Sequence, residues 1–144
     1  MRAALVIFSA LAVAGCQDPL SDWETSGVTA TAEAELGDTL PNVSTMSETR
    51  RLLATAPDVD KLTIRYFGLG QDKLGNESRA PFYSATFDGN QVSRANFENL
   101  DMFEASSLAE SVDIESVQGR VVLAARCPFT EAVCMTALKQ PEPQ

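Results

Sequence analysis

The chain has 144 residues, of which 44% are hydrophobic and 22% are charged, which is enough material for a single domain. Eleven Lys and Arg against twenty Asp and Glu give a formal net charge of −9, and a surface this acidic is repelled by phosphate backbones, which argues against nucleic acid as a partner. The chain contains no histidine and only three cysteines, which excludes His-dependent catalysis, His-ligated zinc and an all-cysteine tetrahedral metal site.

The amino-terminal segment has the pattern of a secretory signal. Arg2 supplies a positive charge, and residues 3–15 form an apolar run whose only polar member is Ser9. This run is too short to cross roughly 30 Å of hydrocarbon, which takes about twenty residues, but it has the length of a signal-peptide core. The sequence therefore predicts a signal peptide over residues 1–15.

The residues that end this run, Val13-Ala14-Gly15-Cys16, resemble the lipobox of bacterial lipoproteins. The resemblance implies cleavage before Cys16, a diacylglyceryl group on its thiol, and anchoring in the bacterial cell envelope by several acyl chains, palmitate among them. In the sorting rule of that class, an aspartate directly after the cysteine retains the protein at the inner membrane. Because Gln17 stands there, the outer membrane is favoured, with the domain in the periplasm, although Asp18 follows one position later. The alternative is an ordinary secretory signal or short membrane anchor in which Cys16 is incidental.

Residues 16–44 show no regular apolar period and are dominated by Thr, Ala, Ser, Gly and acidic residues. Such a segment buries too little apolar surface to offset its ordering entropy. We therefore expect a disordered, lipid-anchored acidic linker, with a short helix over residues 31–36 as the alternative. The only tryptophan, Trp23, is expected either at the membrane headgroups or packed onto the domain.

A single folded domain is expected over residues 45–139, followed by a tail at 140–144. Thr45 and Glu48 fit a capping box, which predicts a helix that starts there and stops before Pro57. Residues 61–67 alternate and are rich in β-formers, and residues 82–87 form a second such run that ends in a tight turn at 88–89. Between the two strands, residues 68–79 are expected to form a long exposed loop.

The second half of the domain completes an α+β pattern. Apolar residues at helical spacing predict a helix over residues 95–110. Residues 114–117 and 120–125 are expected to be strands, and residues 130–139 a short final helix. The sequence thus predicts an α+β domain, with a small antiparallel sheet and two or three helices, after a disordered tether.

A five-residue period offers a different interpretation of part of this domain. Large apolar residues recur every five positions from Phe82 to Val122, with only Ser107 interrupting the series. Residues 95–99 and 100–104 resemble two units of a pentapeptide-repeat protein, which would imply a square β-helix. Charged residues stand at 110, 115 and 120, where that family has small residues, so ordinary core packing is the competing explanation.

Cys127 and Cys134 remain after lipidation of Cys16. In the oxidising envelope that the lipobox implies, we expect these two cysteines to form a structural disulfide between the end of the last strand and the final helix. A redox pair is the alternative. The six intervening residues do not give the Cys-x-x-Cys geometry of thiol–disulfide exchangers.

The usual catalytic and nucleotide-binding motifs are missing from the sequence. There is no Ser-x-x-Lys arrangement, no Gly-x-Ser-x-Gly elbow and no glycine pattern for phosphates, and we expect no cofactor and no bound metal. Glu98, Asp101 and Glu104 lie three apart, which could place an acid–base pair or calcium ligands on one helix face, although a solvated face is the simpler interpretation. Six arginines could gather on a sheet face and bind an anion, or be scattered over the surface: Arg50, Arg65, Arg79, Arg94, Arg120 and Arg126.

These observations predict a non-enzymatic envelope lipoprotein, an accessory or assembly protein whose domain contacts another envelope protein. The alternative is a lipoprotein that binds a small ligand or an ion through the loop at 68–79. An apolar pocket beside that loop would favour ligand binding, and a flat sheet face would favour a protein partner. The third possibility is a carboxylate-based hydrolase that uses Glu98 and Asp101.

Overall fold

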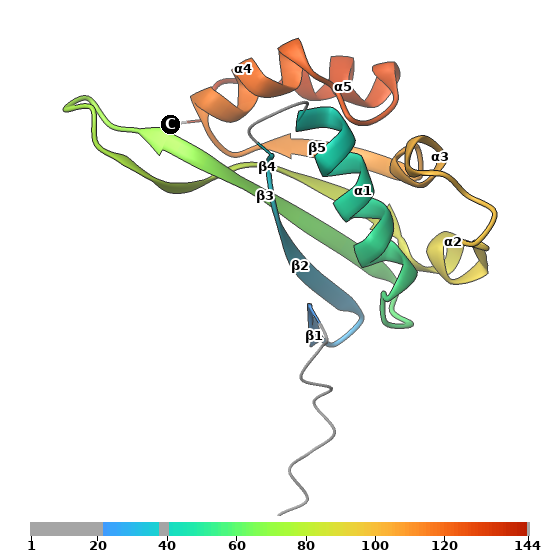
Figure 1. Cartoon of the computed structure of the whole chain (residues 1–144). Coiled ribbons are helices and arrows are strands. Elements are labelled where there is room, and N and C mark those ends of the chain that lie inside the picture. Colours follow the sequence, from blue (N-terminus) through green and yellow to red (C-terminus); the bar gives the residue numbers. More distant parts are fainter. Residues whose placement is uncertain (1–21, 38–40, 144) are drawn as a thin grey trace, which may run out of the picture.

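The computed structural model describes residues 22–37 and 41–143, which form a five-stranded sheet with helices packed against it (Figure 1). The predicted α+β class is confirmed. The predicted signal peptide and Cys16 lie outside the described residues. The strands are β1 (Trp23–Ser26), β2 (Thr29–Glu35), β3 (Lys61–Gln71), β4 (Glu77–Asp88) and β5 (Ala109–Ile114); the helices are α1 (Pro41–Ala54), α2 (Gly89–Arg94), α3 (Met102–Ser106), α4 (Val117–Ala125) and α5 (Glu131–Leu138).

The strands lie in the sheet in chain order, from β1 to β5. Neighbours are antiparallel except β2 and β3, which run parallel. A parallel pair needs a crossover connection, and α1 lies within the one that joins β2 to β3. The sheet is therefore mixed and not purely antiparallel as predicted, and the part of the chain with described structure holds five helices instead of two or three.

The predicted disordered linker is wrong for residues 23–35, which form a hairpin at one edge of the sheet. Ala30, Ala32 and Ala34 alternate with outward-facing Thr and Glu and are almost fully buried. This inward row consists of alanines, so its period-two pattern carries little apolar signal in the sequence. Pairing of β2 with β1 and β3 supplies the backbone hydrogen bonds that stabilise it, so the folded domain starts at Trp23 and not at residue 45.

Trp23 belongs to the core of the domain. Its side chain is buried, and its indole Nε1 donates a hydrogen bond to the carbonyl oxygen of Leu52 in α1 at 3.0 Å. Of the two placements expected for this residue, packing onto the domain is the one found. The hydrogen bond satisfies the only polar group of the ring, as a buried tryptophan requires.

One face of the sheet carries the hydrophobic core. The inward residues of the five strands form a single cluster with side chains of α1, α4 and α5, so these helices cover the same face. Leu62, Ile64 and Tyr66, the predicted inward row of β3, are fully buried in this cluster. The opposite face presents Thr, Glu and Arg side chains from β2 and β3, such as Glu33 and Arg65. No helix within the described part of the chain is long and apolar enough to cross a bilayer.

The first helix begins earlier than the capping box predicts. α1 starts at Pro41, and Thr45 lies inside the helix with its side chain buried, so the helix start predicted at Thr45 is wrong. Proline is tolerated in the first turn of a helix because the amide hydrogen it lacks has no partner there. The predicted stop before Pro57 agrees with the helix end at Ala54.

The predicted turn at 88–89 is instead a helix start. Asp88 is the N-cap of α2, and its carboxylate accepts from the backbone N–H groups of Asn90 and Gln91. The predicted helix over 95–110 is reduced to α3, because Asp101 and Glu104 cap a new helix start within it. Beyond α3, residues 109–114 turn into strand β5.

The expected strand at 120–125 is helix α4, which Ser116 caps by accepting from the N–H of Gly119 at 3.0 Å. Val and Ala in this run are compatible with a strand or a helix, so composition alone does not decide between them. Packing against the rest of the domain decides for the helix. The final helix is confirmed as α5, with Thr130 as its N-cap. The residues of the five-residue period fall in strands and helices alike, so the pentapeptide-repeat interpretation is wrong.

Candidate functional site

Strands β3 and β4 extend beyond their neighbours as a two-stranded arm (Figure 1). β2 pairs with β3 only as far as Phe67, and β5 pairs with β4 only over residues 83–87, whereas β3 and β4 pair with each other out to Gln71 and Glu77. We call residues 68–80 the arm. The predicted exposed loop at 68–79 is therefore mostly a hairpin, whose glycines and polar residues conceal the strand pattern.

The turn at the tip of the arm is held by one side chain. The Asp72 carboxylate accepts hydrogen bonds from the backbone N–H groups of Leu74 and Asn76 and from the Asn76 side-chain amide, at 2.8, 2.9 and 3.0 Å. These bonds, that from the Asn76 side chain first, lower the pKa of Asp72. Gly75 supplies the positive φ of 84° that closes the turn. Leu74, held out by this turn, is 86% exposed.

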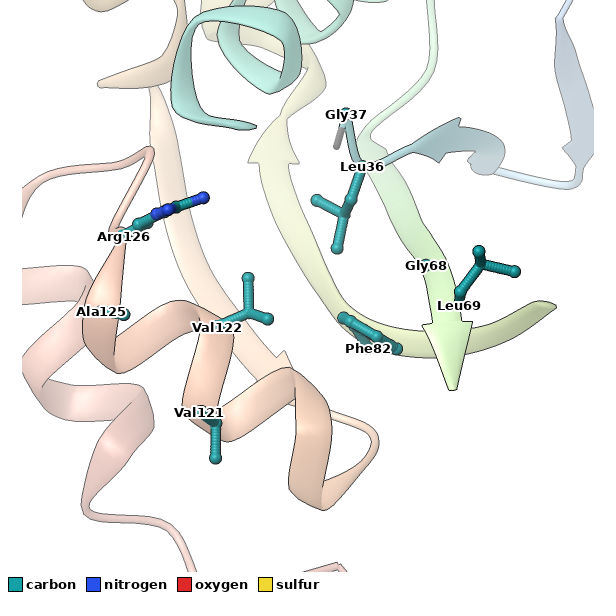
Figure 2. A pocket seen from close by; sticks show the side chains of 9 residues that line it. All are labelled: Leu36, Gly37, Gly68, Leu69, Phe82, Val121, Val122, Ala125 and Arg126. Atoms are coloured by element: carbon teal, nitrogen blue, oxygen red, sulfur yellow. The ribbon is translucent and has the colours of Figure 1, made fainter. Parts of the chain in front are cut away.

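A cavity of about 350 Å³ lies at the base of the arm, between the sheet and α4; we call it the groove (Figure 2). In Figure 2 the side chains of Leu36, Phe82, Val122 and Arg126 extend towards its centre. A groove lined mainly by apolar atoms, with few polar groups, is the usual composition of a ligand site. The lining residues are Leu36, Gly37, Gly68, Leu69, Phe82, Val121, Val122, Ala125 and Arg126.

A register shift places Phe82 in the groove. Tyr66 faces Tyr83 and Phe67 faces Pro81, so Phe82 is the extra residue of a β-bulge. Two glycines make room for its ring and backbone: a Cβ on Gly68 would lie 2.8 Å from the Phe82 ring, and a Cβ on Gly119 would lie 1.8 Å from its carbonyl oxygen. The close approach of α4 to β4, which shapes the groove, therefore depends on Gly119.

Among the residues whose structure is described, Arg126 is the only charged one that lines the groove. It is the C-cap of α4, and its backbone N–H donates to the carbonyl oxygen of Val122 at 2.8 Å. The Arg126 side chain is exposed, and among residues 22–37 and 41–143 its guanidinium takes part in no hydrogen bond or ion pair. An apolar groove with an available guanidinium at its mouth can hold an anionic group with an apolar extension.

The six arginines do not gather on one sheet face. Arg50 donates to the carbonyl oxygens of Phe97 and Leu100 and so fixes the segment between α2 and α3. Arg120 donates to the carbonyl oxygens of Leu138 and Gln140 at the end of α5, at 2.7 and 2.6 Å. Arg65 and Arg79 form ion pairs on the outer face, and Arg94 is exposed at the end of α2. Of the two arrangements that the sequence left open, scattered arginines are the one found.

The three carboxylates of the acidic cluster are mostly occupied by helix capping. Asp101 accepts from the N–H of Glu104 at 2.8 Å, and the Glu104 carboxylate accepts from the N–H of Asp101 at 2.9 Å. Glu98 lies exposed in the segment before α3. Within the residues whose structure is described, no three His, Cys, Asp or Glu side chains are close enough to bind one metal ion.

Cys127 and Cys134 lie within disulfide distance, with their Cα atoms 6.1 Å apart, which is compatible with the predicted bond. The bond joins the segment after helix α4 to α5, whereas a strand end was expected in place of α4. Between the cysteines, the Phe129 ring contacts Tyr66 and Tyr83 edge-on, with ring centres 5.8 and 6.1 Å apart. The cysteine pair thus holds an aromatic side chain over the core.

The groove was not among the sites that the sequence indicates. Three segments that no local pattern connects supply Leu36, Phe82 and Val122. Nothing in the sequence distinguishes Arg126 from the five other arginines considered. The predicted ligand loop contributes only its first two residues, Gly68 and Leu69. No known protein family, no curated protein and no solved structure matches this chain.

Proposed function

We propose that this protein is a non-enzymatic lipoprotein of the bacterial cell envelope, anchored through Cys16, whose domain binds another envelope protein through the arm. Anchoring, outer-membrane sorting and a periplasmic domain follow from the lipobox resemblance and from Gln17. The feature that supports a protein partner is the arm, because it exposes two large apolar side chains. Leu69 and Leu74, at its base and tip, are 63% and 86% exposed.

The arm offers a template for strand addition. Its two strands pair with each other, and within the described structure neither β2 nor β5 continues beside it. Strand edges with free N–H and C=O groups pair readily with an extended segment of another protein. On the side of α4, the Gln118 side chain donates to the carbonyl oxygen of Gln71 at 3.3 Å. That contact steadies the arm where a partner would meet it.

The early start of the domain also fits a role close to the membrane. Trp23 follows Cys16 by seven positions and is already part of the core. An extended chain spans at most roughly 3.5 Å per residue. A lipid on Cys16 would thus hold the domain within about 25 Å of the bilayer, where a partner would be an integral or membrane-bound envelope protein.

The test is crosslinking of the full chain in native membranes, with a photo-reactive residue at position 74 and a tag after Gln144. The matched control position is Val28, which is also exposed, at 62%, but lies in the turn between β1 and β2. We expect one stoichiometric crosslinked partner at position 74. With the photo-reactive residue moved to the exposed position 73, that partner should be lost in Leu74→Asp and retained in Val28→Asp. Equal crosslinking at position 28 would exclude the arm as the binding surface. A chain that migrates alone would exclude a stable protein partner.

The groove favours a second candidate, a lipoprotein that binds a small ligand. The pocket lies beside the segment that the sequence indicates for ligand binding, and Gly68 and Leu69 form part of its wall. Its volume of about 350 Å³ is at the lower end of the usual range for ligand pockets, roughly 300–1,000 Å³. The two sites share Leu69, but Leu74 does not line the groove and Ala125 is not part of the arm, so variants at these two positions test partner binding and ligand binding separately.

A further inference from the structure

The chemistry of the groove narrows the class of ligand. Its wall is formed by aliphatic side chains and one phenyl ring, with Leu36 and Val122 facing each other across the opening (Figure 2). Burial of aliphatic surface there is favourable and non-directional, so the wall suits a hydrocarbon chain better than a polar metabolite. The described part of the groove supplies one charge, that of Arg126 at its mouth.

We propose that the groove binds an aliphatic carboxylate, with its hydrocarbon chain against Leu36, Phe82 and Val122 and its headgroup on Arg126. This inference rests on the second candidate function, ligand binding, and names the ligand class. A guanidinium offers two parallel N–H donors that match the two oxygens of a carboxylate. Arg126 supplies the one positive charge among the described residues that line the groove, and this charge makes the mouth of the groove complementary to one negative charge.

The position of Arg126 indicates a residue that binds the ligand headgroup, and not an arginine that is merely exposed on the surface. The residue ends α4 at the same turn that carries Val122 and Ala125, so headgroup and chain sites are joined by one rigid helix. Four other arginines already donate guanidinium hydrogens to carbonyl or carboxylate oxygens of this chain: Arg50, Arg65, Arg79 and Arg120. Arg126 has no such acceptor among the residues that the structure describes, which leaves its donors for a ligand.

The test uses the full chain in native membranes and a photo-reactive fatty acid that carries a diazirine on its chain. We expect the label on α4, on Leu36 just after β2 and on Phe82 in β4, and we expect it to be displaced by unlabelled fatty acids. Each added methylene should improve displacement by up to roughly fourfold until the groove is filled. The corresponding fatty alcohols and a lysophospholipid should displace the label at least tenfold less well.

Two pairs of variants separate the groove from its surroundings. Ala125→Trp should fill the groove and abolish labelling, whereas Ala124→Trp, at an exposed neighbour that does not line the groove, should leave it unchanged. Arg126→Ala should weaken displacement by the fatty acid about tenfold, because a charged hydrogen bond is lost at a partly exposed site. Arg126→Lys should restore part of that loss, and Arg94→Ala, at another exposed arginine near a helix end, should have no effect.

The outcomes distinguish this inference from the function on which it rests. If the probe labels no groove residue, or if Ala125→Trp does not reduce labelling, the groove is not a ligand site. The ligand-binding function and the carboxylate assignment then both fail. If the groove is labelled but alcohols or lysophospholipids displace the probe as well as acids do, or if Arg126→Ala has no effect, ligand binding stands and the carboxylate assignment fails. Leu74→Asp should change neither result, because it alters the tip of the arm only.

Discussion

The guanidinium carbon of Arg79 lies 3.7 Å from the centre of the Phe67 ring, on the face of the sheet opposite the core. Arg65 approaches the same ring at 5.2 Å. Under this cover Phe67 is only 7% exposed, although it points away from the hydrophobic cluster. Arg79 also pairs with Glu33 at 2.9 Å and with Glu35, so one side chain of the arm is fixed to β2. The arm is therefore held at its base and open at its tip.

Arg79→Ala should uncover Phe67 and loosen the base of the arm. Loss of the cation–π contact and of a doubly paired but exposed charge is expected to lower the free energy of unfolding, by less than the loss of a buried pair would. Denaturant unfolding followed by the fluorescence of Trp23, the only tryptophan, measures this change. Lys73→Ala, in the turn of the same arm, is the control and should leave stability unchanged; equal effects would argue against the Phe67 contact.

Gly119→Ala tests the approach of α4 to β4. Helix propensity alone would make alanine more stable than glycine by about 1 kcal/mol. The Cβ would lie 1.8 Å from the carbonyl oxygen of Phe82, so α4 has to move away. We expect a net destabilisation of about 2 kcal/mol and a widened groove, because overpacking against backbone outweighs propensity. A more stable variant would show that α4 packs less closely than described.

Removal of the cysteine pair should destabilise the domain without changing its fold. In the chain-entropy model, opening a loop of about eight residues costs roughly 2.5 kcal/mol. Cys127→Ala together with Cys134→Ala should lower the unfolding midpoint by a corresponding amount. Reduction of the unmutated protein should have the same effect, and reduction of the double variant should have none. A double variant as stable as the parent would mean that the bond is absent.

The two tyrosines predict a loss of stability at alkaline pH. Burial raises the pKa of Tyr66 and of Tyr83 well above the usual value near 10. Because the unfolded chain releases these protons first, stability is full below pH 10 and falls as the pH rises above it, by roughly 1 kcal/mol per pH unit for each tyrosine. Phenolate absorbance should therefore appear together with unfolding, and a rise near pH 10 in the folded protein would contradict the burial.

The site variants act on different parts of the molecule and therefore serve as controls for one another. Arg79→Ala alters the base of the arm, and Leu74→Asp alters its tip. Gly119→Ala changes the shape of the groove, whereas Ala125→Trp fills it. A partner that is lost in Leu74→Asp but retained in Ala125→Trp would separate the two proposed functions in one set of membranes.

Local patterns in the sequence determined the α+β class, the strands at 61–67 and 82–87 and the final helix. Each of these has a period or a cap that acts within about ten residues, which is the range that such patterns describe. The edge hairpin of β1 and β2 escaped prediction because the inward residues of β2 are alanines, whose burial depends on Trp23, Leu52 and β3.

Only the tertiary structure decided the rest. The segment that carries Val121, Val122 and Ala125 is helical because Ser116 caps α4. Gly119 then lets α4 lie against Phe82, a contact between residues more than thirty positions apart in the chain. The groove forms where β2, β3, β4 and α4 meet. The resemblance to a lipobox is the opposite case, because it lies in four consecutive residues, from Val13 to Cys16, and needs no fold. The proposed targeting thus depends on a local pattern, whereas the arm and the groove, the two proposed binding surfaces, are produced by long-range packing.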